Sequence, residues 1–173
     1  MITDIDHTPE FLAELKKACA KEIHAGILGK ENSDIVKIAT INEWGARIDY
    51  NAHPKVLKWF YANMRDQGIQ ALPKGTPKGY FIIPERAAIR KAFDNNDNIS
   101  SVFKFGQEAF NNTGDIVKAI HAMGSKMVSK IQESYRSNIA PSNHPLTVAM
   151  KGGKDKTLVA SGKLQQAVSY ELK

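Results

Sequence analysis

Residues 115–137 read DIVKAIHAMGSKMVSKIQESYRS, the longest stretch of the chain with helical spacing. Apolar residues recur every three or four positions along it, which is the period of an amphipathic helix. They are Ile116, Ile120, Met123, Met127, Val128, Ile131 and Tyr135. Thr113 or Asp115 can cap the N-terminus. The pattern predicts one long helix that buries Ile120, Met127 and Ile131 and leaves Lys126 exposed on the opposite face.

Shorter elements are expected on both sides of this helix. Spacing and capping residues indicate helices over about 8–19, 33–44, 54–67, 85–93, 99–111 and 161–167. Short apolar runs indicate strands over about 23–28, 80–83 and 168–172. Because the strands are few and separated by helices, the sequence predicts an α+β fold, with a small antiparallel sheet packed against several helices.

The length and composition fit a single domain over residues 1–173, with 42% hydrophobic and 24% charged residues. Within it we expect a less regular insertion at about 46–79 and a flexible loop at about 138–157, where turn residues accumulate. No apolar run approaches the roughly 18–20 residues that span a bilayer, and the N-terminus is acidic where a signal peptide is basic. Cys19, the only cysteine, is expected to be buried on the first helix. These features favour the reducing cytoplasm and no membrane partner.

The formal net charge of +6 is distributed unevenly along the chain. Residues 1–50 carry −3, residues 51–100 carry +4 and residues 101–173 carry +5. A basic excess of this kind can contact nucleic acid through phosphates, and it is also common on solvated protein surfaces. The charge therefore supports nucleic-acid binding as one hypothesis among others.

Catalytic and metal-binding motifs were not found in the sequence. The histidines, His7, His24, His53, His121 and His144, have no metal-binding spacing on one element. Residues 152–157, GGKDKT, lack the first glycine of a phosphate-binding loop and place Asp155 after the lysine. Glu22 and His24 form a potential acid–base pair, but a sheet-edge pair without chemistry is favoured. We therefore expect no enzyme and no cofactor.

The aromatic residues near the middle of the chain have two interpretations. Trp44, Trp59, Phe60 and Tyr61 could stack on bases, but three of the four share one predicted helix. Core packing or a subunit interface explains them more simply.

Four groups of residues carry a family resemblance through their order and spacing. The first is Gly26-Ile27-Leu28 at a strand end, and the second is IATINEWG over 38–45. The third is IPER over 83–86, and the last is a tail that reads PSNHPLTVAMKG over 141–152, LVASGKL over 158–164 and VSY over 168–170. Together they resemble the tail-completion proteins, also called neck or minor tail components, of tailed bacteriophages and prophages. The resemblance covers about residues 20–172.

The residues that match the family motifs are expected to have structural roles. They are Asn42, Glu43, Gly45, Pro84, Arg86, Arg90, Gly162 and Leu164. The chain departs from the family pattern at Ala88, where a large residue is usual, and at Ala160, where Asp is usual.

The resemblance implies a structural virion protein that forms part of a ring at the head–tail junction. The implied partners are further copies of the chain, the head connector and the tail terminator or tube, with DNA passing through the channel. The implied location is the virion, after synthesis in the bacterial host cytoplasm. The long loops are the best candidates for contacts with partners or subunits. Their basic side chains are Lys74, Lys78, Lys151, Lys154 and Lys156.

Three alternatives stay open at this point. A tail-terminator or head-completion ring protein would occupy an adjacent position in the same particle. A basic nucleic-acid-binding module is supported by the net charge of +9 over residues 51–173. A hydrolase or toxin is the least supported.

Overall fold

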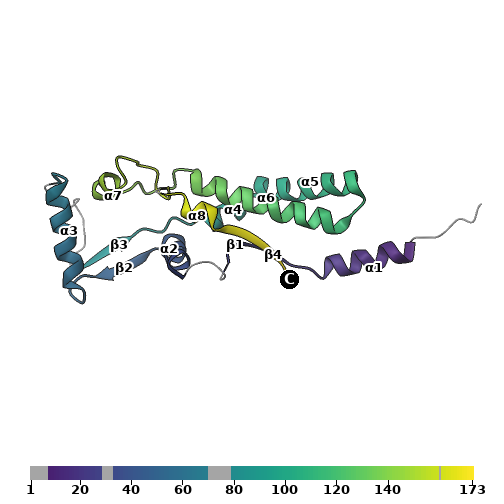
Figure 1. The fold of residues 1–173 in the computed structure, drawn as a ribbon, viewed down its shortest axis with the longest axis horizontal. Helices are drawn as coiled ribbons and strands as arrows, with labels where there is room; N and C mark the ends of the chain where they lie inside the picture. The colour runs from purple at the N-terminus through teal and green to yellow at the C-terminus, as the bar shows by residue number, and fades with distance from the viewer. Residues whose placement is uncertain (1–7, 29–32, 70–78, 160) are drawn as a thin grey trace, which may run out of the picture.

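The computed structural model describes residues 8–28, 33–69, 79–159 and 161–173, and its fold is α+β. The helices are α1 (Thr8–Cys19), α2 (Ser33–Trp44), α3 (Pro54–Asp66), α4 (Ala88–Phe93), α5 (Asn96–Thr113), α6 (Ile116–Arg136), α7 (Pro145–Met150) and α8 (Lys163–Gln166). The strands are β1 (Ile23–Ile27), β2 (Ala46–Asp49), β3 (Tyr80–Ile83) and β4 (Val168–Leu172). The molecule is drawn out along one axis, with α1 near one end and α3 at the other (Figure 1). Among the described helices, none has the length and apolar character needed to cross a membrane.

The long helix predicted from the sequence is α6. Asp115 caps it, because its Oδ1 accepts hydrogen bonds from the backbone nitrogens of Val117 (2.9 Å) and Lys118 (3.0 Å). α5 lies beside α6 as its antiparallel neighbour (Figure 1). Gly106 permits this close approach, since a Cβ at that position would lie 2.5 Å from Cγ of Met123. The α5–α6 pair forms one layer of the molecule.

The hydrophobic core lies between α6, α4 and the C-terminal part of the chain. Ile131 and Tyr135 of α6 are the largest fully buried side chains among the described residues. The residues packed with them are Ala88, Ala92, Ile139, Leu158 and Val168. The pKa of Tyr135 is raised to about 12, mainly by burial and secondly by the negative charge of Glu43. The predicted burial of Ile131 is confirmed.

Other positions of α6 differ from the sequence prediction. Ile120 and Met127 are only half-buried. Lys126, expected on an exposed face, is also half-buried, and its Nζ lies 5.3 Å from the ring centroid of Phe105. The cation lies near the aromatic ring of a residue of α5, a tertiary contact that sequence periodicity does not reveal.

The described strands form two separate two-stranded antiparallel sheets, where one sheet was expected. β1 pairs with β4 and places Ala25 opposite Tyr170, while β2 pairs with β3 and places Ile48 opposite Phe81. β2 lies in the region predicted to be a less regular insertion, so this strand was missed. Its sequence ARID has only two apolar residues and no apolar run, unlike the YFII of β3, and its partner follows only after α3.

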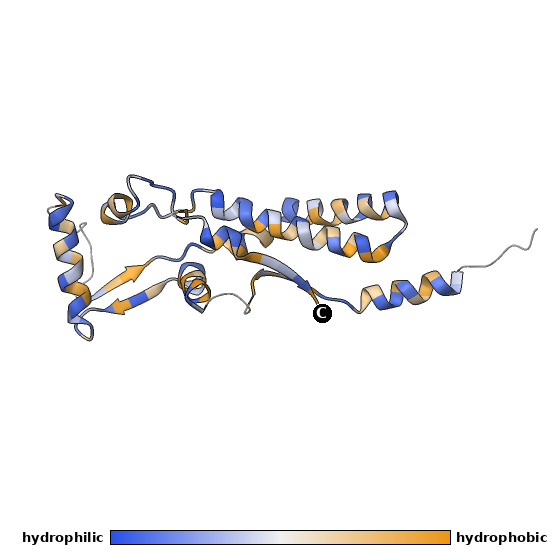
Figure 2. Cartoon of the chain, in the orientation of Figure 1, coloured by the Kyte–Doolittle hydropathy of each residue, from blue (hydrophilic) through white to orange (hydrophobic). Residues whose placement is uncertain are grey.

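β2, β3 and α3 form an arm at one end of the molecule (Figure 1). Phe60 of α3 packs on Phe81, with 4.5 Å between the ring centroids, so α3 contacts the face of the strand pair that carries Phe81. On the other face Ile82 is 58% exposed. Figure 2 shows that β3 is hydrophobic along most of its length although its sheet has only two strands. The arm therefore exposes apolar surface.

A helix and tertiary hydrogen bonds occupy residues 138–157, where a flexible loop was predicted. α7 forms within this segment, and Nδ1 of His144 caps it by accepting a hydrogen bond from the backbone nitrogen of Leu146 (3.1 Å). Leu146 and Ile139 are buried, and the backbone nitrogen of Ile139 donates to Oγ1 of Thr157 (3.1 Å). Burial of these few apolar residues and the long-range hydrogen bonds offset the entropy of ordering the turn-rich segment.

α1 has the predicted bounds, but its apolar face is only partly covered. Phe11 and Leu12 are exposed, and the ring of Phe11 lies 6.5 Å from that of Phe110 in α5. Cys19 is exposed and free, contrary to the expected burial. Ala18, one position earlier, is the buried residue of this turn, so the helix is rotated relative to the expected face.

Candidate assembly surface

Glu43, near the end of α2, caps the start of α4. The N-cap residue of α4 is Ala87, whose side chain provides no capping bond. The Glu43 carboxylate accepts hydrogen bonds from the backbone nitrogens of Ile89 (3.1 Å) and Arg90 (2.9 Å) instead. These nitrogens belong to the first turn, where backbone donors have no partner within the helix. Glu43 is 8% exposed, and the favourable end of the helix dipole stabilises its buried charge.

Arg90 connects this cap to an exposed tryptophan. Its Nε lies 3.3 Å from Oε1 of Glu43, and its Nη2 donates to the Glu43 carbonyl (2.6 Å) and to Oε1 of Glu85 (2.7 Å). The guanidinium carbon lies 4.1 Å from the ring centroid of Trp44, which is 64% exposed. A guanidinium fixed by several acceptors can order the ring on which it stacks. The indole of Trp44 is therefore held in one orientation at the surface.

Gly45 makes the turn between α2 and β2. Its φ is +73°, and a Cβ there would lie 2.9 Å from the carbonyl oxygen of Ile83 and 3.1 Å from the backbone nitrogen of Glu85. Both the left-handed backbone and the close approach require glycine. Beside it, the backbone nitrogen of Arg86 donates to the carbonyl of Asn42 (2.7 Å). The end of α2 and the chain after β3 are thus locked together.

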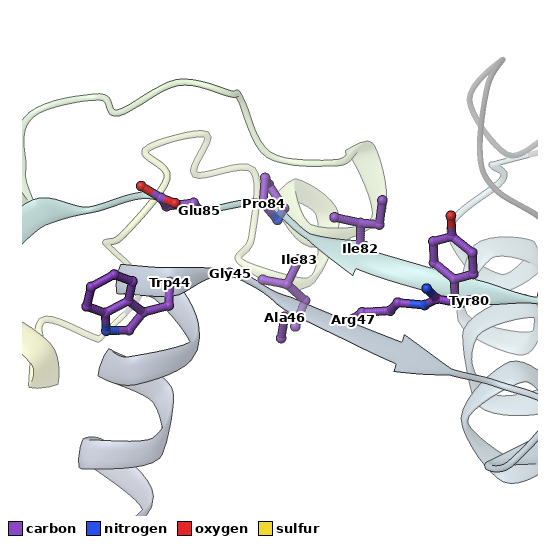
Figure 3. Close-up of a pocket in the computed structure, with 9 residues that line it drawn as sticks. All are labelled: Trp44, Gly45, Ala46, Arg47, Tyr80, Ile82, Ile83, Pro84 and Glu85. Atoms are coloured by element: carbon purple, nitrogen blue, oxygen red, sulfur yellow. The ribbon is translucent and has the colours of Figure 1, made fainter.

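A shallow hollow of about 500 Å³ lies beside this junction (Figure 3). It is lined by Trp44, Gly45, Ala46, Arg47, Tyr80, Ile82, Ile83, Pro84 and Glu85. Figure 3 shows the ring of Trp44 turned away from the strands and the side chain of Arg47 reaching toward Tyr80, whose ring centroid lies 3.7 Å from the guanidinium carbon. Glu85 is paired with Arg90. The charged side chains at the hollow, Arg47 and Glu85, are thus both engaged by neighbouring side chains of the same chain.

Arg86 ties the junction to the C-terminal segment. Its side chain is buried, and it donates from Nε to the carbonyl of Pro141 (3.0 Å) and from Nη2 to the carbonyl of Ser142 (3.2 Å). Burial lowers the pKa of Arg86 from its ordinary value. The arginine stays charged because that ordinary value is so high. The hydrogen bonds of this buried cation to the C-terminal segment are accepted by backbone carbonyl oxygens.

Lys151 has an internal role that the sequence prediction did not anticipate. Its Nζ donates to the carbonyls of Lys156 (2.9 Å) and Thr157 (2.9 Å), across the turn that follows α7. Burial first, and the charge of Arg86 second, lower the pKa of Lys151. Lys151, which was expected to contact partners, thus also stabilises its own segment, and its contact with a partner stays a prediction. Lys154 and Lys156 are exposed, as a contact residue must be.

The structure brings together six of the eight residues predicted from the family motifs. They are Asn42, Glu43, Gly45, Pro84, Arg86 and Arg90. Gly162 and Leu164 lie elsewhere: Gly162 has a left-handed φ of +78° before α8, and Leu164 packs against the core. Lys74 and Lys78 lie outside the described residues.

Two exposed residues of α2 were missed by sequence reasoning. Ile38 and Ile41 were expected on the inner side of the helix, but both are exposed, on the same side as Trp44. Ala39 and Glu43 take the buried positions instead. The position of Glu43 could have indicated this exposure. If the motif glutamate is buried, the helical period places Ile38 and Ile41 on the solvent side of the helix.

Comparison with family models, with curated proteins and with solved structures gives no match for this chain. Within the described part of the chain, no group of three or more His, Cys, Asp or Glu side chains could hold a metal ion.

Proposed function

We propose that this chain is a structural virion protein of a tailed phage or prophage, a neck or tail-completion component of the ring that joins the head connector to the tail. In this role it needs no cofactor and no catalytic residues. Its partners are further copies of itself and the neighbouring neck and tail proteins, and its place is the head–tail junction.

The observation that carries the proposal is the meeting of three motifs that are far apart in the sequence. Glu43 of the IATINEWG motif binds Arg90 beside the IPER motif, and Asn42 binds the backbone of Arg86. Arg86 in turn binds the carbonyls of Pro141 and Ser142 in the tail motif. Residues that resemble a family in order and spacing thus have a joint structural task. A shared task is the physical reason for motifs to recur together.

The exposed apolar side chains also support a role in assembly. Trp44, Trp59, Ile82 and Phe103 are each at least half exposed. Contiguous exposed apolar surface is typical of sites that bind other proteins, and Trp44 and Ile82 line the same hollow. A ring subunit covers them when it assembles.

A deletion in an inducible prophage that encodes the chain tests this function. We expect filled heads and finished tails that do not join, with joining restored by a plasmid copy, and the chain detected by mass spectrometry in wild-type virions. Tails of uncontrolled length would indicate a terminator instead, and heads that lose their DNA would indicate head completion. Normal infectious particles from the deletion would refute a structural role.

The nucleic-acid-binding alternative is tested by measuring the binding of the purified protein to DNA. Binding to duplex DNA that weakens steeply as salt rises would favour the nucleic-acid-binding alternative, because each phosphate contact releases counterions. For a neck component we expect no binding at physiological salt.

A further inference from the structure

Two apolar surfaces of the chain have no partner within the described structure, and they lie apart. The first, the α2 surface, consists of Ile38, Ile41 and Trp44, spaced three residues apart along one side of α2. α2 and the α5–α6 pair lie on different sides of the molecule (Figure 1). The α2 surface is therefore unable to cover anything on the α5 helix of its own chain.

The second, the α5 surface, consists of Ile99 and Phe103 of α5 with Phe11 and Leu12 of α1. Phe103 is 61% exposed, and Ile99 lies one turn before it on the same side of the helix. Ile99 and Phe103 thus begin an apolar stripe along α5. Phe11 of α1 extends this stripe, because its ring contacts Phe110, which lies two turns beyond Phe103. α1 covers only the last part of the stripe, so its middle is left open.

We propose that the α2 surface of one copy packs against the α5 surface of a second copy, in a head-to-tail contact. This inference rests on the proposed function and names the subunit interface of the ring. After one contact forms, one copy still has a free α5 surface and the other a free α2 surface, so the contact repeats, and it closes into a ring if its rotation permits.

The areas of the two surfaces fit a subunit contact. Each surface exposes roughly 300–400 Å² of apolar side chain, judged from the sizes of its residues and their exposed fractions. Since somewhat more than half of an interface is apolar, the two together correspond to about 1,200 Å² of buried surface, the low end for a specific complex. We therefore expect an association that depends on protein concentration.

Trp44 is the natural anchor of the contact. Its ring is large, exposed and already ordered by the stacked guanidinium of Arg90, which Glu43 and Glu85 hold in place. Tryptophan and arginine are enriched among the residues that dominate binding energy, and an ordered side chain loses little entropy on binding. The opposing α5 surface offers the aromatic and aliphatic groups that an indole packs against.

Sedimentation equilibrium of the purified full chain over a wide concentration range tests the contact. We expect the average mass to grow beyond that of a dimer, and Trp44→Glu and Phe103→Glu each to weaken association at least about tenfold. The matched control is Trp59→Glu, an exposed tryptophan on α3 that is 50% exposed and belongs to neither surface, and it should leave association unchanged. Far-ultraviolet circular dichroism and the melting temperature establish that the variants are folded.

Mixing the two disrupted variants separates a head-to-tail contact from a symmetric one. The Phe103→Glu chain retains its α2 surface and the Trp44→Glu chain retains its α5 surface, so an equal mixture should form dimers and nothing larger. A mixture that stays monomeric overturns the proposal. So does a wild-type chain that is monomeric at every concentration, or a Trp59→Glu control that weakens association as much as Trp44→Glu.

Cross-linking gives a readout that does not depend on loss of binding. In a Cys19→Ser background, a short thiol cross-linker should join an Ile41→Cys chain to a Phe103→Cys chain. An Ile41→Cys chain that cross-links mainly to itself would show a symmetric α2 contact and overturn the proposal. The prophage deletion tests the function separately: a chain present in virions with no α2–α5 contact disproves only the interface, and the converse result disproves only the function.

Discussion

The backbone nitrogen and the guanidinium Nε of Arg90 both approach the same carboxylate oxygen of Glu43, at 2.9 Å and 3.3 Å. One buried acid therefore completes the first turn of α4 and fixes the side chain that stacks on Trp44. The same side chain thus contributes both to the stability of the junction and to the order of the exposed tryptophan.

Replacement of Glu43 should accordingly be costly. Glu43→Ala removes the acceptor of two helix donors and one of the acceptors of Arg90, so it should lower the free energy of unfolding by about 2–4 kcal/mol. Glu43→Gln keeps an oxygen for the helix donors but loses the charge, and should cost about 1–3 kcal/mol. Urea unfolding measures both. The control is Glu85→Gln, an exposed partner of the same arginine, which should cost less than about 1 kcal/mol. Equal effects of Glu43→Ala and Glu85→Gln would contradict the capping role.

Gly45 can be tested against a glycine with the same backbone conformation. Gly45 and Gly68 have φ of +73° and +67°, but no atom lies within 4 Å of a Cβ built at Gly68. Gly68→Ala should therefore cost only the conformational penalty, about 1–2 kcal/mol. Gly45→Ala adds a contact of 2.9 Å with the backbone of Ile83, so it should cost at least about 1 kcal/mol more. Thermal unfolding of the two variants decides whether the close approach matters.

The sequence predicted those parts of the structure that repeat a period over several turns. α6 was predicted because its apolar residues recur over more than five turns and Asp115 marks its start. β2 was missed because its sequence ARID is not an apolar run like the YFII of β3, and because its partner β3 comes only after α3. Local pattern carries no information on which strand pairs with which.

The candidate surface was predicted only in part, for a related reason. The family motifs located Glu43, Arg86 and Arg90, but not how they are used, because their acceptors and donors come from distant segments. The exposure of Ile38 and Ile41 was predicted wrongly, because α2 is apolar on two sides and only packing decides which side is inside.

Ile131 should behave as a core residue. It is fully buried among α4, α6 and the C-terminal segment, so Ile131→Ala should lower the free energy of unfolding by about 2–5 kcal/mol. Val117→Ala, on an exposed position of the same helix, should cost less than about 1 kcal/mol. Chemical denaturation of both variants checks the orientation of α6, and similar losses would mean that the helix is rotated about its axis.

His144 should make stability depend on pH. Burial lowers the pKa of His144 below its ordinary value of 6.5, and its Nδ1 must be unprotonated to cap α7. As the pH falls below about 6.5, the unfolded chain binds this proton before the folded chain does, so stability falls. The carboxyls of Asp115 and Glu133 have lowered pKa values and titrate at lower pH.

The melting temperature at pH 7.5 and pH 5.5 measures this effect. His144→Asn keeps a side-chain oxygen for the cap and removes the titrating group. The variant should therefore lose less stability than the wild type over this range. An unchanged pH dependence in the variant would show that another group is responsible.

The lysines after α7 should separate stability from assembly. Lys151→Ser removes the donor to two backbone carbonyls in a partly buried turn, so it should lower the free energy of unfolding by about 1–3 kcal/mol. Lys154 and Lys156 are exposed, and replacing both by Ser should change stability by less than about 0.5 kcal/mol. If these two lysines contact a neighbour in the neck, the double variant folds normally but fails to restore head–tail joining in the prophage deletion. Full restoration of infectious particles by the double variant would mean that both lysines only face solvent, and the contact would then have to be sought on the α2 and α5 surfaces.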